Sequence, residues 1–260
     1  RLRTLDLAFY PNERGPYNFD VESSDFSAGI NKDGYLNNPE TRWGGMTRKI
    51  ETNDFEAANI EFIEFWMMDP FMYEPNHTGG EFYINLGNIS EDILKDSRKS
   101  FENGLPIDGS DSNIDTTVWG RVPSIQSLVN AFDNDDGARE NQDLGYDGLN
   151  DLQEKDFNDY IERIQSNFNI TDSVYIKAEL DPAADNFKYF RNTQFDNLET
   201  SILSRYKDYN GIDGNSPTSE QSVETYPTSA TNLPNVEDIN SDQTLSESES
   251  YYQYKIDLKP

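Results

Sequence analysis

Residues 58–69 read A-N-I-E-F-I-E-F-W-M-M-D, and residues 79–87, after a turn-rich connection, read G-G-E-F-Y-I-N-L-G. The first run carries apolar side chains on both faces of an extended strand, a pattern typical of strands that are covered on both sides. The second run alternates apolar and polar side chains over residues 82–86. Together the two runs predict an antiparallel pair at the centre of a sheet, with Trp66 in its interior.

Shorter patterns on either side of this stretch predict the rest of the fold. Alternation predicts strands at residues 5–10, 41–50, 116–119 and 252–258, and helical spacing predicts helices at residues 90–101, 124–132 and 150–168. The fold class is therefore mainly β (α+β), and we expect a jelly-roll-like antiparallel β-sandwich with several helices and long acidic loops. We expect its core among the aromatic runs of the first third of the chain, with the acidic remainder as scaffold around it.

The same patterns divide the chain into parts. Residues 1–132 are expected to form the β-sandwich core with short helices, and residues 133–214 a helical and acidic insertion. Residues 215–235 are rich in Ser, Thr and Pro and are expected to be a mobile polar loop, while residues 236–260 supply a returning C-terminal strand of the same domain. The chain begins with Arg1 instead of an initiator methionine and no apolar stretch follows, so we do not expect its first residues to be a signal peptide, and we expect the chain to be a piece of a longer protein.

The composition limits the classes of function. The chain has 49 acidic and 21 basic residues and a formal net charge of −28, which repels phosphate backbones and argues against nucleic-acid binding. The same field attracts divalent cations or a basic partner, or it serves solubility alone. There is no cysteine and a single histidine, His77, so thiolate and multi-histidine metal sites are excluded. No run of residues approaches the length of a membrane-spanning helix.

Residues 143–154 read D-L-G-Y-D-G-L-N-D-L-Q-E and follow the spacing of a twelve-residue calcium loop. Calcium is a hard cation that takes several oxygen ligands from alternate residues of a turning loop, and a glycine at the sixth position allows the turn. At the third position Gly145 offers no side-chain oxygen, so a water or a neighbour such as Asp133, Asp135 or Asp136 would have to replace it. The predicted ligands are Asp143, Asp147, Leu149, Asp151 and Glu154.

Residues 238–249 read D-I-N-S-D-Q-T-L-S-E-S-E and form a second candidate loop. Gln243 stands where a glycine is expected, which places a non-glycine residue in a strained conformation. The predicted ligands here are Asp238, Asn240, Asp242, Thr244 and Glu249. In a chain this acidic, both spacings also arise in ordinary acidic turns and helix caps, so Ca²⁺ and simple caps remain alternatives for both loops.

The sequence offers no catalytic constellation, and we expect a protein that is not an enzyme. It has no nucleophile elbow, phosphate loop or nucleotide fingerprint, and a carboxylate pair such as Glu61 and Glu64 is typical of solvated strand charges. Trp43, Trp66 and Trp119 could form a sugar-stacking platform or fill a core. An exposed platform beside a calcium site would indicate a carbohydrate-binding jelly-roll module of a cell-surface protein, whereas buried tryptophans would favour a structural domain.

Several longer motifs resemble one family. They are LDLAFYPNERGPYN at residues 5–18, WGGMTR at 43–48, NIEFIEFW at 59–66, LGNISED at 86–92, FENGLP at 101–106, QDLGYDGL at 142–149, and the stretch 237–254. Together they resemble the SprA/Sov family of Bacteroidetes, the gliding-motility proteins that form the outer-membrane translocon of the type IX secretion system. The resemblance spans nearly the whole chain.

The resemblance implies a soluble, non-catalytic part of a very large outer-membrane protein, on the periplasmic or extracellular side. Such a part would act in structure or in protein–protein contact. The implied partners are other parts of the same translocon barrel, a PorV-like shuttle, a plug protein, or secreted cargo proteins. The chain lacks the repeated lipid-facing hairpins of a barrel wall, so we expect no direct membrane span in it. The family supplies no catalytic residues.

Overall fold

The computed structural model describes residues 9–52, 54–72, 76–101, 104–125, 133, 136–186, 188, 191–202, 204–205, 238–242 and 244–259. Helices and strands both occur, so the class is mixed α+β. In chain order the elements are η1 (Pro39–Thr41), β1 (Gly80–Asn88), β2 (Ile114–Thr116), β3 (Arg121–Pro123), α1 (Asp136–Gln142), α2 (Asp151–Asp156), η2 (Phe157–Asp159), α3 (Tyr160–Asn167), α4 (Ser173–Leu180), α5 (Thr193–Asn197) and β4 (Ser250–Leu258).

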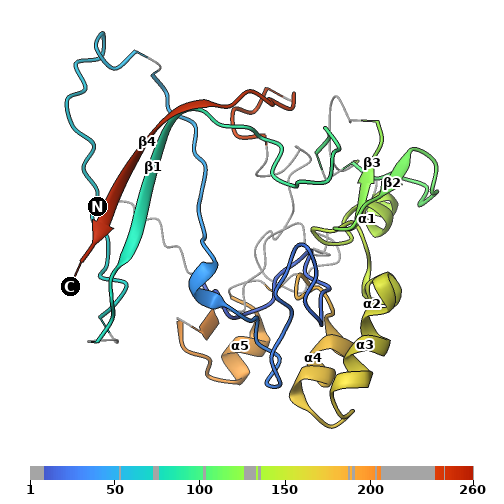
Figure 1. Ribbon diagram of the computed structural model, residues 1–260. Coiled ribbons are helices and arrows are strands. Elements are labelled where there is room, and N and C mark those ends of the chain that lie inside the picture. Colours follow the sequence, from blue (N-terminus) through green and yellow to red (C-terminus); the bar gives the residue numbers. More distant parts are fainter. Residues whose placement is uncertain are drawn as a thin grey trace.

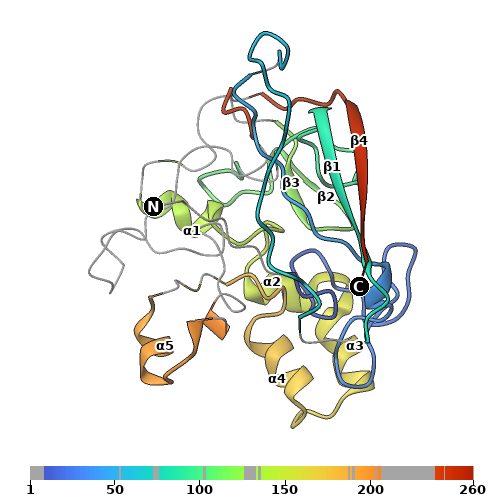
Figure 2. The same ribbon diagram turned by 90° about the vertical axis from the view of Figure 1, so that its left-hand side faces the viewer.

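The strands of the described residues form two separate two-stranded antiparallel sheets, β1 with β4 and β2 with β3. In the longer pair Phe82 lies opposite Ile256, and Ile84 opposite Tyr254. This pairing confirms that residues 82–86 and 252–258 are strands, as their alternation predicts. Helices α2 to α5 lie together at one end of the molecule and both sheets lie toward the other (Figures 1 and 2).

The apolar core lies in the helical part and not among the aromatic runs. Phe19 and Val21, from the loop before η1, pack against α3 and α4. Tyr160 and Ile164, one turn apart on α3, are 1% and 0% exposed. Their spacing places both on the same face of the helix. Other members of this core are Leu149, Ala178 and Ala183, with Ile30, Phe157, Ile161, Phe168, Val174 and Tyr175 partly buried against it.

Helical spacing predicts one helix at residues 150–168, and the structure realises it as α2, η2 and α3. Asn150 begins the helical run with a capping box, because its side chain accepts from the backbone N–H of Gln153 and the Gln153 side chain accepts from the N–H of Asn150. Asn158 and Asp159 adopt left-handed φ values of 51° and 54°, and there the helix kinks. Asn and Asp tolerate this conformation better than other side chains do.

The predicted jelly-roll-like sandwich is not confirmed, because each sheet of the described residues has only two strands. Residues 58–69, expected at the sheet centre, form neither strand nor helix, and Trp66 is 100% exposed. Trp43 is 85% exposed, whereas Trp119 is half-buried. The expectation that Trp66 lies in the interior of a sheet is therefore wrong. An apolar run indicates that its side chains are covered by another surface, but it does not indicate whether that surface belongs to the same chain.

Other expected elements also differ. Residues 42–50 contain no strand and residues 90–101 no helix. Of the strand expected at 116–119, only Thr116 is in a strand, as the last residue of β2. Residues 1–8 and 126–132, where a strand and a helix are expected, lie outside the described residues, as does the polar loop at 215–235. The division of the chain at 132, 214 and 235 stays a prediction.

Candidate metal centre

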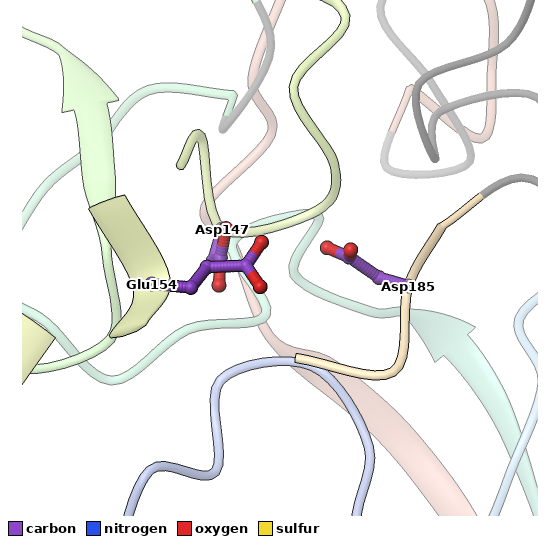
Figure 3. A group of neighbouring side chains, drawn as sticks. All are labelled: Asp147, Glu154 and Asp185. Carbon is purple, nitrogen blue, oxygen red and sulfur yellow. The ribbon is translucent and has the colours of Figure 1, made fainter. Parts of the chain in front are cut away.

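Three buried carboxylates meet between the loop before α2, α2 itself and the segment after α4. Asp147, Glu154 and Asp185 each offer an oxygen that lies within 4.8 Å of those of the other two. Their side chains point toward one another, with Asp185 facing Asp147 and Glu154 from the opposite side (Figure 3). The three residues are 2%, 0% and 0% exposed. Among the described residues, these are the acidic groups that converge closely enough to share an ion.

One oxygen of each carboxylate is held by a backbone N–H group. The N–H of Leu149 donates to Asp147 Oδ1 at 3.0 Å, that of Ala183 to Glu154 Oε2 at 3.0 Å, and that of Tyr146 to Asp185 Oδ2 at 2.9 Å. The other oxygens have no hydrogen-bond partner and are buried; they are Asp147 Oδ2, Glu154 Oε1 and Asp185 Oδ1. Each side chain is thus fixed through one oxygen and unsatisfied at the other.

The loop that carries Asp147 is anchored to two other parts of the fold. The N–H of Arg121, at the start of β3, donates to the carbonyl of Asp147 at 2.7 Å. The Tyr17 hydroxyl donates to the carbonyl of Tyr146, the residue before Asp147, at 2.7 Å. These long-range contacts fix the backbone on both sides of the carboxylate.

The segment that carries Asp185 is tied to α3 through a partly buried arginine. Arg14 donates to the hydroxyl of Tyr160 and to the carbonyl of Pro182. Its guanidinium also lies over the Tyr160 ring, 4.6 Å from the centroid. Arg14 therefore positions the segment through hydrogen bonds, and it forms no salt bridge with the three carboxylates.

Burial raises the pKa values of all three acids, and the charges of neighbouring carboxylates add to the rise. Burial raises the pKa of Asp147 to about 7. It raises the pKa of Asp185 to about 8, with added repulsion from Asp147. The pKa of Glu154 rises to about 10, through burial first and then through the charges of Asp147 and Asp185. The cluster therefore resists ionisation unless a positive charge enters it.

The first predicted calcium loop contributes only part of its ligand set. Asp147 and Glu154 meet in the cluster, but the carboxylate of Asp143 pairs with Arg139 of α1. Asp151 accepts a hydrogen bond from Asn186 Nδ2 at 2.9 Å. Leu149 contributes its N–H group to Asp147, and its side chain lies in the core.

Asp185 is the member that the sequence pattern missed. It lies beyond α4, outside the twelve-residue spacing, and only the fold brings it to Gly145. There Asp185 occupies the space that a side chain at the third loop position would need. Of the neighbours expected to fill that position, Asp133 is exposed and Asp135 lies outside the described residues. The small residues Ala183 and Ala184, just before Asp185, are a weak signal for such a close approach.

The second predicted loop folds around another acid. The buried Glu91 accepts hydrogen bonds from the N–H groups of Asn240 at 3.3 Å and Ser246 at 2.8 Å. The side chains of the predicted ligands Asp238, Asn240 and Asp242 accept hydrogen bonds from backbone groups of the loop itself, Asp242 from Thr244, and Glu249 is exposed. In its described residues, 238–242 and 244–249, the loop brings no carboxylate cluster together. Calcium binding there stays a prediction.

Comparison with known families gives a match in the second half of the chain. Residues 159–260 match the family model SprA_N, described as a motility related/secretion protein. The match covers α3, α4, α5, β4 and Asp185, and over these residues it supports the resemblance drawn from the motifs. No curated protein matches the chain. None of the helices in the described residues has the length and apolar content needed to cross a bilayer.

Proposed function

We propose that the chain is a non-catalytic domain of an outer-membrane type IX secretion translocon and that it acts by binding another polypeptide of that machinery. The family match supports a role in motility or secretion. The observation that carries the contact role is the ribbon of β1 and β4, which presents apolar side chains to solvent. Tyr252, Tyr254 and Ile256 of β4 are 77%, 54% and 41% exposed.

The ribbon is incomplete as a sheet. A two-stranded ribbon is at best marginally stable in water, and an edge strand exposes unpaired N–H and C=O groups. Within the described residues, β1 and β4 pair only with each other, so each has an outer edge without a neighbour. An extended segment that adds to such an edge gains backbone hydrogen bonds, and its side chains cover the apolar faces.

Residues 60–69 extend the same apolar surface. The rings of Phe65 and Phe82 lie 5.3 Å apart between centroids, so this segment contacts β1. Figure 1 shows it running beside the ribbon. Phe62 and Met68 are 78% and 76% exposed, and Trp66 fully so. A surface this rich in large apolar side chains is typical of a protein–protein interface.

The occupant we propose is a strand of the translocon itself. The test is site-specific photo-cross-linking in the intact secretion protein in cells, with the probe placed at Tyr254 in β4. The matched control is Leu152 of α2, which is also apolar and 73% exposed. We expect Tyr254 to cross-link to translocon polypeptide and Leu152 not to do so. Equal labelling from both positions would contradict the proposal, and cross-links to a shuttle, plug or cargo protein would reassign the partner.

Carbohydrate binding is a second candidate, and the exposed tryptophans favour it. An open cavity of about 560 Å³ is lined by Phe26, Arg42 and Trp43, among other residues. An exposed tryptophan can stack on a sugar face. Titration with oligosaccharides of the bacterial surface would detect such binding, and Trp43→Ala should abolish it. Binding that is lost in this variant supports the sugar module, whereas the secretion role predicts no binding at all.

A further inference from the structure

The three buried carboxylates present an electrostatic problem. Asp147, Glu154 and Asp185 form no salt bridge in the described structure, although buried charges are stable only when paired or neutralised. Each has one oxygen that is buried and has no hydrogen-bond partner. Buried polar atoms are satisfied in the great majority of cases, so three such oxygens in one place indicate an ion or protons between them.

We propose that Asp147, Glu154 and Asp185 bind one Ca²⁺, which joins the loop before α2 to the segment after α4. The donor set consists of carboxylate oxygens alone, the ligands that hard cations prefer. Two oxygens that bind the same Ca²⁺ at its usual distance lie at most about 5 Å apart. The separation of the three carboxylates, within 4.8 Å, meets this limit.

Calcium fits this enclosure better than magnesium. Mg²⁺ gives up its waters reluctantly and usually keeps several of them, whereas Ca²⁺ accepts bidentate carboxylates and backbone carbonyls in a flexible shell. The ligands are 2%, 0% and 0% exposed, which leaves little space for a hydrated ion. The binding loop is not a regular calcium loop, because the ligand missing at Gly145 comes from the distant Asp185.

The ion would act as a structural link. Asp185 lies within the family-matched segment 159–260, whereas Asp147 and Glu154 precede that segment. All three flank the helical core of α2, α3 and α4. Because the ligands come together only in the folded chain, the free energy of binding adds to the free energy of folding. This inference does not depend on the proposed secretion role.

The test uses the full chain, stripped with a chelator and then titrated with CaCl₂ in excess NaCl and MgCl₂. We expect a single saturable site by calorimetry. At a Ca²⁺ concentration about a hundred times the Kd, the melting temperature should rise by about 5–10 °C. In Asp185→Asn we expect the affinity to fall at least about tenfold and the shift in melting temperature to be lost. Because the amide can keep the hydrogen bond from Tyr146 and donate to the facing carboxylates, this variant should fold and, without Ca²⁺, melt no lower than the unmodified chain.

The matched control is Asp156→Asn, which removes a charge from an exposed position of α2. It should bind Ca²⁺ within about threefold of the unmodified chain, because Asp156 is not among the charges that act on the three carboxylates. The proposal is overturned if the unmodified chain shows neither heat nor stabilisation, or if Asp185→Asn binds as well as the unmodified chain does. Should Asp185→Asn fail to fold by circular dichroism, Glu154→Gln serves in its place with the same expectations.

Discussion

Gly145 and Asp185 fit together so closely that a Cβ atom at Gly145 would lie 2.2 Å from Asp185 Oδ2. The backbone of Gly145 has a φ of +111°, which other residues rarely adopt. The distant acid therefore reaches the loop only because the third position has no side chain. This contact explains why a loop that departs from the usual calcium pattern still brings carboxylates together.

Gly145→Ala should damage the cluster. The added methyl group displaces the Asp185 carboxylate and strains the backbone, so we expect a loss of about 1–3 kcal/mol in the free energy of unfolding, measured by urea denaturation. Calcium affinity should fall at least about tenfold in the same variant. Gly15→Ala is the control, because a Cβ there meets no atom within 4 Å. If both variants behave alike, the close approach of Asp185 is not important for stability.

The stability of the calcium-free chain should decrease with rising pH. The pKa values of Asp147, Asp185 and Glu154 lie at about 7, 8 and 10. In the unfolded chain the pKa values of these side chains are about 4. The folded state thus holds protons that the unfolded state has released, and its advantage is lost as pH rises from about 5 through these values. Asp151 and Asp181 face the same cluster and increase the effect. Melting temperatures measured in chelator across this range check the sign.

Excess Ca²⁺ should counteract the loss of stability at high pH. The ion competes with protons for the three carboxylates, so the rise in melting temperature that it causes should be larger at about pH 8 than at about pH 5.5. Calorimetry in buffers of different ionisation enthalpy should also detect proton release on binding near neutral pH. A calcium effect that is equal at both pH values would mean that the ion binds to exposed, already ionised side chains.

Substitutions in the helical core and in the exposed aromatic run should differ in their effect on stability. Ile164 is 0% exposed within the helical core, so Ile164→Ala should cost about 2–5 kcal/mol in chemical denaturation. Trp66 is 100% exposed, so Trp66→Ala should change stability by less than about 0.5 kcal/mol. A large effect of Trp66→Ala in the isolated chain would show that the aromatic run is part of a core after all.

Hydrogen exchange should separate the same two regions. Backbone amides of α3 lie over the core, whereas β4 belongs to a two-stranded ribbon with exposed faces. We expect β4 amides in the isolated chain to exchange faster than those of α3, and to become protected when the ribbon binds its partner. Strong protection of β4 in the isolated chain would argue that the ribbon is complete without a partner.

Local patterns in the sequence predict local structure well here. The alternation at residues 82–86 and 252–258 identifies β1 and β4, and helical spacing at residues 150–168 identifies α2 and α3 with Ile164 inward. The kink at Asn158 is not visible in that spacing, because apolar periodicity reports a face and not backbone continuity.

Non-local features are where the sequence prediction is wrong or incomplete. The run that ends in Trp66 has the composition of a buried strand, but the described chain provides no cover for it. The calcium-loop spacing identifies Asp147 and Glu154, because both lie within one turn and the helix that follows it. Asp185 joins them only through the packing of α3 and α4, which no local spacing encodes.

A diffraction map of the chain crystallised with CaCl₂ gives the most direct test of the calcium site. We expect an anomalous peak with one oxygen each from Asp147, Glu154 and Asp185 at about 2.3–2.6 Å. A map without a peak there, in which the three carboxyl groups instead share protons through hydrogen bonds to one another, would contradict it.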